Sequence, residues 1–212
     1  MKILFLIPIA FLLTGCAFFS NPKTESLDNT AYYENRVPNN LTVDLEISGT
    51  YKETGKIEII NNDVYINYQR SVGEPQDQNF NDSFFAHLTE DGYEYYRRSV
   101  LHNTSWISFV PVSTDKENPN ALDAINVLTS VSNSAFYDVF NVRVVNGTKP
   151  SGTRHLDDEP VRTYVLNDTS YYFSENMNMF LKISQNSDKN IDWSVKVKSY
   201  QDISAFTDSP SL

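Results

Sequence analysis

Cysteine is nearly absent from this sequence: Cys16 is the only one among 212 residues. No disulfide can therefore form within the chain, and the single thiol has to be explained by its own position. A chain of this length can bury a sizeable core without such crosslinks. We therefore expect one ordinary folded domain that is stabilised by burial of apolar side chains.

Glycine and positive charge are also scarce. Only 7 glycines are present, so glycine-rich phosphate-binding loops are not expected. The formal net charge is −10 and the pI is about 4.7. Nucleic acid as a partner is excluded on this basis because it requires a basic footprint. The same charge disfavours electrostatic adhesion to anionic lipid headgroups.

The strongly apolar run of the chain lies at its beginning, after Lys2. It is too short to cross a bilayer as a helix of about 20 residues. Its length instead fits the apolar core of a secretory signal, roughly 7–15 residues. We therefore expect residues 1–15 to be a signal peptide and not a structural element.

The segment Leu13-Thr14-Gly15-Cys16 resembles the bacterial lipobox. The resemblance implies that a diacylglycerol is joined to the Cys16 thiol, that the chain is cut before Cys16, and that the new amine receives an acyl chain such as palmitate. Several acyl chains give lasting membrane attachment. Ala17 after the cysteine implies the outer membrane in a cell with two membranes, or the outer face of the plasma membrane in a cell with one. Residues 16–40 are then the lipidated cysteine and a tether.

From Leu41 onward, apolar and polar residues alternate with a period of two, which predicts strands with one buried face. Asn61-Asn62 and Asp91-Gly92 suit tight hairpin turns. We expect about six antiparallel strands in the first half of the chain, over residues 41–51, 56–60, 63–70, 84–88, 93–100 and 105–112.

Helical spacing follows at Leu122, Ile125 and Leu128, and it predicts a helix over about 119–131, with a second short piece over 134–140. Strand patterns resume at 140–145, 161–167, 170–173, 179–184 and 192–200, and residues 146–160 are expected to form a long polar loop. The predicted fold for residues 41–212 is a single, mostly β, α+β domain. In it, a curved open antiparallel sheet (a half-barrel) wraps around one or two short helices.

This layout resembles the LolA/LolB fold, which is shared by lipoprotein carriers and by LppX/LprG-type glycolipid-binding lipoproteins. The resemblance rests on the lipobox, on the meander with a central helix, and on the segment 193–203, which is similar to the family's closing strand. It implies an apolar cavity between the sheet and its helices. The chain departs from the family in its weak helical signal before the first strand and in its short central helix.

No catalytic or metal constellation is recognisable, so an enzyme is not expected and no cofactor is implied. His87, His102 and His155 fall in separate segments without the spacing of a zinc site. The run Asp157-Asp158-Glu159 offers oxygen ligands of the kind that Ca²⁺ prefers. It lacks the spacing of a calcium loop, and a solvated acidic loop is the simpler interpretation.

The apolar residues on the alternating strands and on the helix form a stripe along one face, and two interpretations of this stripe remain open. Its residues either form a solid core or line a slot for acyl chains. The first gives a lipoprotein that docks an envelope protein through its outer face or through residues 146–160. The second gives a lipid-anchored binding protein for a lipid or for the acyl chains of a lipoprotein. The candidate ligand-binding residues are Ile66, Tyr68, Phe85, Tyr95, Trp106, Leu122, Ile125, Leu128, Val195 and Val197.

Overall fold

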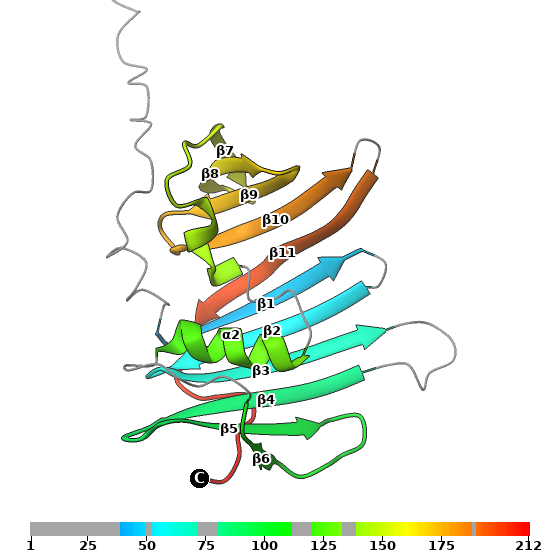
Figure 1. Cartoon of the computed structure of the whole chain (residues 1–212), viewed down its shortest axis with the longest axis vertical. Coiled ribbons are helices and arrows are strands. Elements are labelled where there is room, and N and C mark those ends of the chain that lie inside the picture. Colours follow the sequence, from blue (N-terminus) through cyan, green and yellow to red (C-terminus); the bar gives the residue numbers. More distant parts are fainter. Residues whose placement is uncertain (1–38, 50–51, 72–79, 112–119, 133–138, 188–189) are drawn as a thin grey trace, which may run out of the picture.

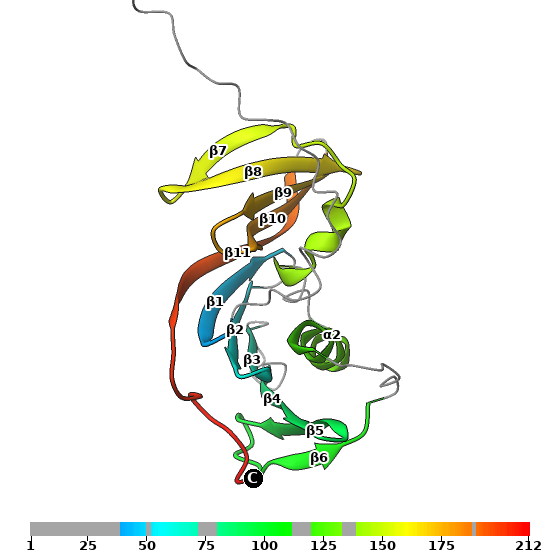
Figure 2. The same ribbon diagram turned by 90° about the vertical axis from the view of Figure 1, so that its left-hand side faces the viewer.

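A computed structural model describes residues 39–49, 52–71, 80–111, 120–132, 139–187 and 190–212. Cys16 and the segments predicted as signal peptide and tether lie outside the described residues, apart from 39–40. The described part is mostly β-structure, with eleven strands in one antiparallel sheet that is not closed. Its one α-helix lies against one side of the sheet, which bends around it in Figure 2.

The first six strands form a meander, as the alternation predicted. They are β1 (Leu41–Ser48), β2 (Lys52–Ile60), β3 (Asp63–Ser71), β4 (Phe80–Thr89), β5 (Gly92–Ser99) and β6 (Ile107–Phe109). The predicted turn at Asn61-Asn62 is confirmed: both residues have positive φ, 51° and 72°, as a primed two-residue hairpin turn requires. The expected strand over 105–112 is much shorter than predicted, since only β6 is paired there.

Helix α2 (Ala121–Ser132) connects the two halves of the sheet and packs on β3 and β4. Asn120 caps it: the Asp123 backbone N–H donates to Asn120 Oδ1 at 3.1 Å, and the Asn120 N–H donates to Asp123 Oδ2 at 3.4 Å. Leu122, Ile125 and Leu128 are buried against the sheet. The predicted helix is thus confirmed, although position 119, where it was expected to begin, lies outside the described residues.

The second half returns in five strands: β7 (Gly152–Leu156), β8 (Glu159–Leu166), β9 (Thr169–Ser174), β10 (Met179–Ser187) and β11 (Asn190–Asp202). Strand β11 pairs with both β10 and β1, so the order across the sheet is β6-β5-β4-β3-β2-β1-β11-β10-β9-β8-β7. Figure 1 shows the two ends of this sheet, β6 and β7, far apart. The last strand therefore joins the two halves at the middle of the sheet.

Two expectations for this half are wrong. Residues 140–145 are not a strand, because Val142–Val145 form the 3₁₀-helix η3. Val142 and Val145 are three residues apart, and the 3₁₀ repeat of three places both in a second core cluster with Phe173 and Phe180. Residues 146–160 are not one loop, since they contain β7 and its hairpin turn at Asp157-Asp158, where φ is 50° and 69°.

The sheet has an inner face, on which α2 packs, and an outer face. Apolar side chains of β1 to β5, β10 and β11 point inward and form the main core with α2. The outer face of β1 to β5 is crossed by the C-terminal segment 203–212 (Figure 2). We call this segment the C-terminal strap. It is bonded to the sheet from its start, where the Ile203 N–H donates to the Asn40 carbonyl at 2.8 Å.

Candidate functional site

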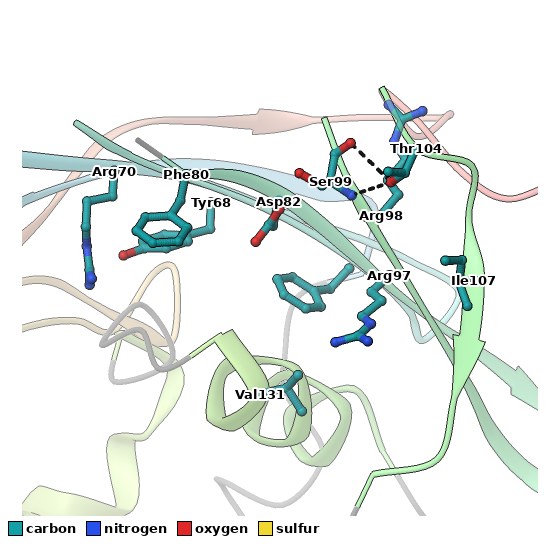
Figure 3. A pocket seen from close by; sticks show the side chains of 11 residues that line it. Tyr68, Arg70, Phe80, Asp82, Arg97, Arg98, Ser99, Thr104, Ile107 and Val131 are labelled. Carbon is teal, nitrogen blue, oxygen red and sulfur yellow. Dashed lines mark hydrogen bonds between the residues drawn. The ribbon is translucent and has the colours of Figure 1, made fainter. Parts of the chain in front are cut away.

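A cavity of about 470 Å³ lies on the inner face, between strands β3 to β6 and the last turn of α2 (Figure 3). Its apolar lining comes from Tyr68, Phe80, Phe84, Ile107 and Val131. Its polar lining comes from Arg70, Asp82, Arg97, Arg98, Ser99 and Thr104. Its volume lies within the range of small-molecule pockets, roughly 300–1,000 Å³.

Strand register explains why these residues share one face. Ile66 pairs with Phe84, and Phe84 pairs with Arg97, so all three side chains project inward. Two residues further along, Tyr68 pairs with Asp82. Because side chains alternate along a strand, the inner face toward this end of the sheet carries both the aromatic rings and the charged groups.

Large apolar side chains are exposed at the cavity. Phe80 is 48% exposed, Ile107 57% and Val131 39%. They come from β4, β6 and α2, which are distant in the sequence, and Val131 faces the strands across the cavity in Figure 3. Exposed apolar residues are unremarkable singly, but here three of them converge on one concave site.

Arg70 is neutralised at one end of the cavity. Its Nε donates to Glu53 Oε1 at 2.6 Å, and Glu53 is buried on the adjacent strand β2. The guanidinium also lies 5.5 Å from the centre of the Tyr68 ring. Burial, followed by the Glu53 charge, raises the pKa of the Tyr68 phenol well above its ordinary value. This end of the cavity is therefore a fixed, charge-balanced wall with a protonated tyrosine.

Asp82 and Arg97 have no such partners. Within the part of the chain that the structure describes, neither side chain forms an ion pair or a hydrogen bond. Asp82 is half-buried and Arg97 is exposed. Both are directed into the cavity, whereas Arg98 is directed away from it (Figure 3). Arg98 instead forms an ion pair with Asp208 of the C-terminal strap.

Eight of the ten residues predicted to bind a ligand belong to the main core cluster. Tyr68 is the one among them that also lines the cavity. Ile66, Ile125, Leu128 and Val195 are completely buried in the packed core. The other members of this group are Tyr95, Leu122, Val197 and, at the cavity wall, Tyr68. The predicted stripe is therefore brought together by the fold, but most of it lies beside the cavity and not in its wall.

Phe85 and Trp106 are not on this face. Phe85 pairs with Tyr65 and is one position out of phase with the inward-pointing Phe84, so it projects from the outer face. Ile107 pairs with the inward-pointing Arg97, which turns the preceding Trp106 outward as well. Their rings approach edge-to-face at 6.3 Å. Phe84 and Phe85 are consecutive and both aromatic, so the period-two alternation along the strand does not determine which of the two rings faces inward.

Sequence reasoning missed most of the cavity lining, although a signal was present. Asp82 lies two residues before Phe84, and Arg97 lies two residues after Tyr95. Each charge therefore occupies the apolar phase of its strand, where an uncompensated charge is costly unless the site has a use for it. Exposed positions such as Phe80 and Val131 gave no comparable signal.

The other candidate groups are engaged elsewhere. His87 Nδ1 lies 2.9 Å from Asp63 Oδ2, and Asp63 Oδ1 accepts from the Leu88 backbone N–H at 2.8 Å, which ties β4 to the start of β3. Asp157 forms an ion pair with Lys196 at 2.9 Å. Glu159 accepts a hydrogen bond from Ser174 Oγ at 2.5 Å. The acids at 157–159 are thus parts of a hairpin whose side chains diverge.

His102 and His155 are both exposed. His102 lies in a turn, and His155 lies on β7.

No protein-family model matches this chain, and no curated protein sequence matches it. Over the residues that the structure describes, no helix has the length and hydropathy needed to span a membrane. The functional assignment therefore rests on the geometry of the cavity and on the sequence.

Proposed function

We propose that this chain is a lipid-anchored envelope protein that binds a hydrophobic ligand in the cavity between β3–β6 and α2. The observation that carries the proposal is the convergence of Phe80, Ile107 and Val131, all exposed, on a cavity of about 470 Å³. A bound apolar chain would cover these side chains, and each Å² of apolar surface removed from water contributes about 25 cal/mol.

The site needs no bond chemistry to work as a binding site. Its groups are aromatic and aliphatic side chains, four charged side chains and three hydroxyl-bearing residues. Such a lining provides affinity through burial and orientation through a few polar contacts. We therefore propose a binding or carrying role and assign no catalytic step, cofactor or metal to it.

Membrane attachment is proposed from the sequence. The lipobox-like segment ending at Cys16 would place acyl chains on the mature N-terminus, and the acidic chain would not adhere to anionic membranes by charge alone. The open antiparallel sheet with one helix on its inner face is consistent with the LolA/LolB-like half-barrel expected from the sequence. A carrier of lipids or of lipoprotein acyl chains at the cell envelope is the function that these features support best.

An interaction role is the second candidate, and one observation favours it. Strand β7 lies within the segment singled out as a docking loop and is exposed over residues 152–155, and β8 is its only neighbour among the strands that the structure describes. The open edge of a sheet is where another chain can add a strand. If this role is correct, deleting residues 150–159 should abolish co-purification of an envelope partner without unfolding the rest.

Native mass spectrometry tests the binding function. The protein would lack residues 1–15, carry Cys16→Ser, and be purified from its own host before organic extraction. A stoichiometric lipid that is lost on denaturation is the expected result. An apo mass, together with no uptake of an added fluorescent fatty acid, would contradict the proposal and favour the interaction role.

A further inference from the structure

The charges around the cavity identify the kind of headgroup that it would accept. Two of its three arginines are already compensated, Arg70 by Glu53 at 2.6 Å and Arg98 by Asp208. Among the residues that the structure describes, the charges left over at the cavity are Asp82 and Arg97, one of each sign. The cavity is therefore electrically balanced as a whole, but it presents two separate unpaired charges to a ligand.

These two charges lie on neighbouring strands. Asp82 pairs with Ser99 and Phe84 pairs with Arg97, so Asp82 and Arg97 are diagonal neighbours on the inner face. Backbone positions related in this way are roughly 7–8 Å apart, within reach of a long side chain. They nevertheless form no ion pair with each other in the described part of the chain, and Phe84 lines the wall with them.

A bound ligand removes water from these two charges, and the free-energy cost of this desolvation depends on the headgroup. A neutral headgroup leaves both charges partly desolvated without a partner. A headgroup with a single charge satisfies one of them and repels the other. Only a headgroup with both an anion and a cation satisfies both, and charge-assisted hydrogen bonds are about twice as strong as neutral ones.

We propose that the ligand is a zwitterionic amphiphile whose anionic group contacts Arg97, whose ammonium group contacts Asp82, and whose apolar chain packs on Tyr68, Phe80 and Val131. This inference rests on the proposed binding function and specifies the ligand class for the same cavity. The exposed position of Arg97 places the anion toward solvent, and the half-buried Asp82 holds the cation deeper.

Four probes with the same twelve-carbon chain test the headgroup in the unchanged cavity: dodecylphosphoethanolamine, dodecyl phosphate, dodecylamine and dodecyl maltoside. Calorimetric titrations below their micelle-forming concentrations compare their affinities. The zwitterion should bind at least about tenfold more tightly than the other three, which corresponds to one charged hydrogen bond. Equal binding of the maltoside would overturn the proposal while leaving the binding function intact. Failure of all four to bind would instead contradict the binding function.

Two neutralising variants supply an independent readout. Asp82→Asn should raise the affinity for dodecyl phosphate, because Arg97 is then left alone, and should lower that for dodecylamine. Arg97→Gln should do the reverse, and Arg97→Lys should keep the original order. The matched controls Asp168→Asn and Arg154→Gln change exposed charges outside the cavity and should shift neither affinity. An unchanged order of affinities in both cavity variants would show that these two charges do not determine which headgroup binds.

Discussion

The ring of Phe206 stands edge-on against the ring of Phe85, with centroids 5.1 Å apart and an interplanar angle of 81°. This geometry is favourable for two aromatic rings. It joins the C-terminal strap to the outer face of β4, more than one hundred residues earlier in the chain. Phe85 is therefore part of a second, outer packing layer and not of a ligand pocket.

The strap also donates two hydrogen bonds to a buried acid. Glu58 is only 2% exposed, and its carboxylate accepts hydrogen bonds from the Thr207 backbone N–H at 2.7 Å and from the Thr207 hydroxyl. Thr207→Val keeps the shape and removes the hydroxyl donor. Chemical denaturation should show the free energy of unfolding reduced by about 1–3 kcal/mol. Thr153→Val on the exposed strand β7 is the control, and an equal effect there would show that the loss is not specific to Glu58.

Filling the cavity should abolish binding without harming the fold. Val131 lies in the last turn of α2, lines the cavity and is 39% exposed, so Val131→Trp has room to project into it. We expect the affinity for a twelve-carbon amphiphile to fall at least about tenfold, with an unchanged melting temperature, because the indole occupies volume that the chain needs. Val144→Trp, at a similarly exposed valine of η3, should have no effect. Retained affinity in Val131→Trp would place the ligand elsewhere.

The raised pKa of Tyr68 predicts that the folded protein loses stability at alkaline pH. Burial raises the pKa of Tyr68 in the folded chain above the ordinary value of 10.0. Above that pH, the unfolded chain loses the phenol proton while the folded chain keeps it, so stability falls as pH rises. Denaturation curves should show that the free energy of unfolding falls less steeply with rising pH in Tyr68→Phe than in the unchanged protein. Tyr200→Phe, at an exposed tyrosine, is the comparison, and an equally shallow fall there would remove Tyr68 as the cause.

Lipid attachment at Cys16 is measurable directly. We expect the protein from the membrane fraction to begin at Cys16 and to carry a diacylglycerol and a further acyl chain, detected as a mass increase and as incorporation of labelled palmitate. Cys16→Ala should retain residues 1–15 and incorporate no label. Label in Cys16→Ala, or an unmodified Cys16 in the mature protein, would contradict the assignment.

Period and spacing predicted the elements whose stability depends on a local pattern. Leu41, Val43, Leu45 and Ile47 alternate with polar residues, and all four are buried in the main core. The helix followed from three residues at spacings of three, which the Asn120 cap then fixes. Such elements need only a consistent face to bury, and that information is present within a dozen residues.

The cavity could not be predicted in the same way. Tyr68 in the cavity wall and Ile66 in the packed core are two residues apart on one strand. The period-two pattern treats both as inward-facing apolar positions and cannot distinguish them. What separates them is where α2 ends over the sheet, a tertiary property. The strap was missed for a similar reason: residues 203–212 have no period of their own, and their position depends on Phe85, Glu58 and Arg98.

The ladder between β1 and β11 has a consequence for how the molecule assembles. Leu41 pairs with Asp202, so the seam at the middle of the sheet joins the first and the last of the described strands. Contacts this distant in sequence form late, because closing so large a loop costs entropy before any contact repays it. A nascent chain that has not yet reached residue 190 holds β1 with a bare edge, vulnerable to pairing with a neighbour. The central seam can join the two halves of the sheet only after residues 190–202 have been synthesised.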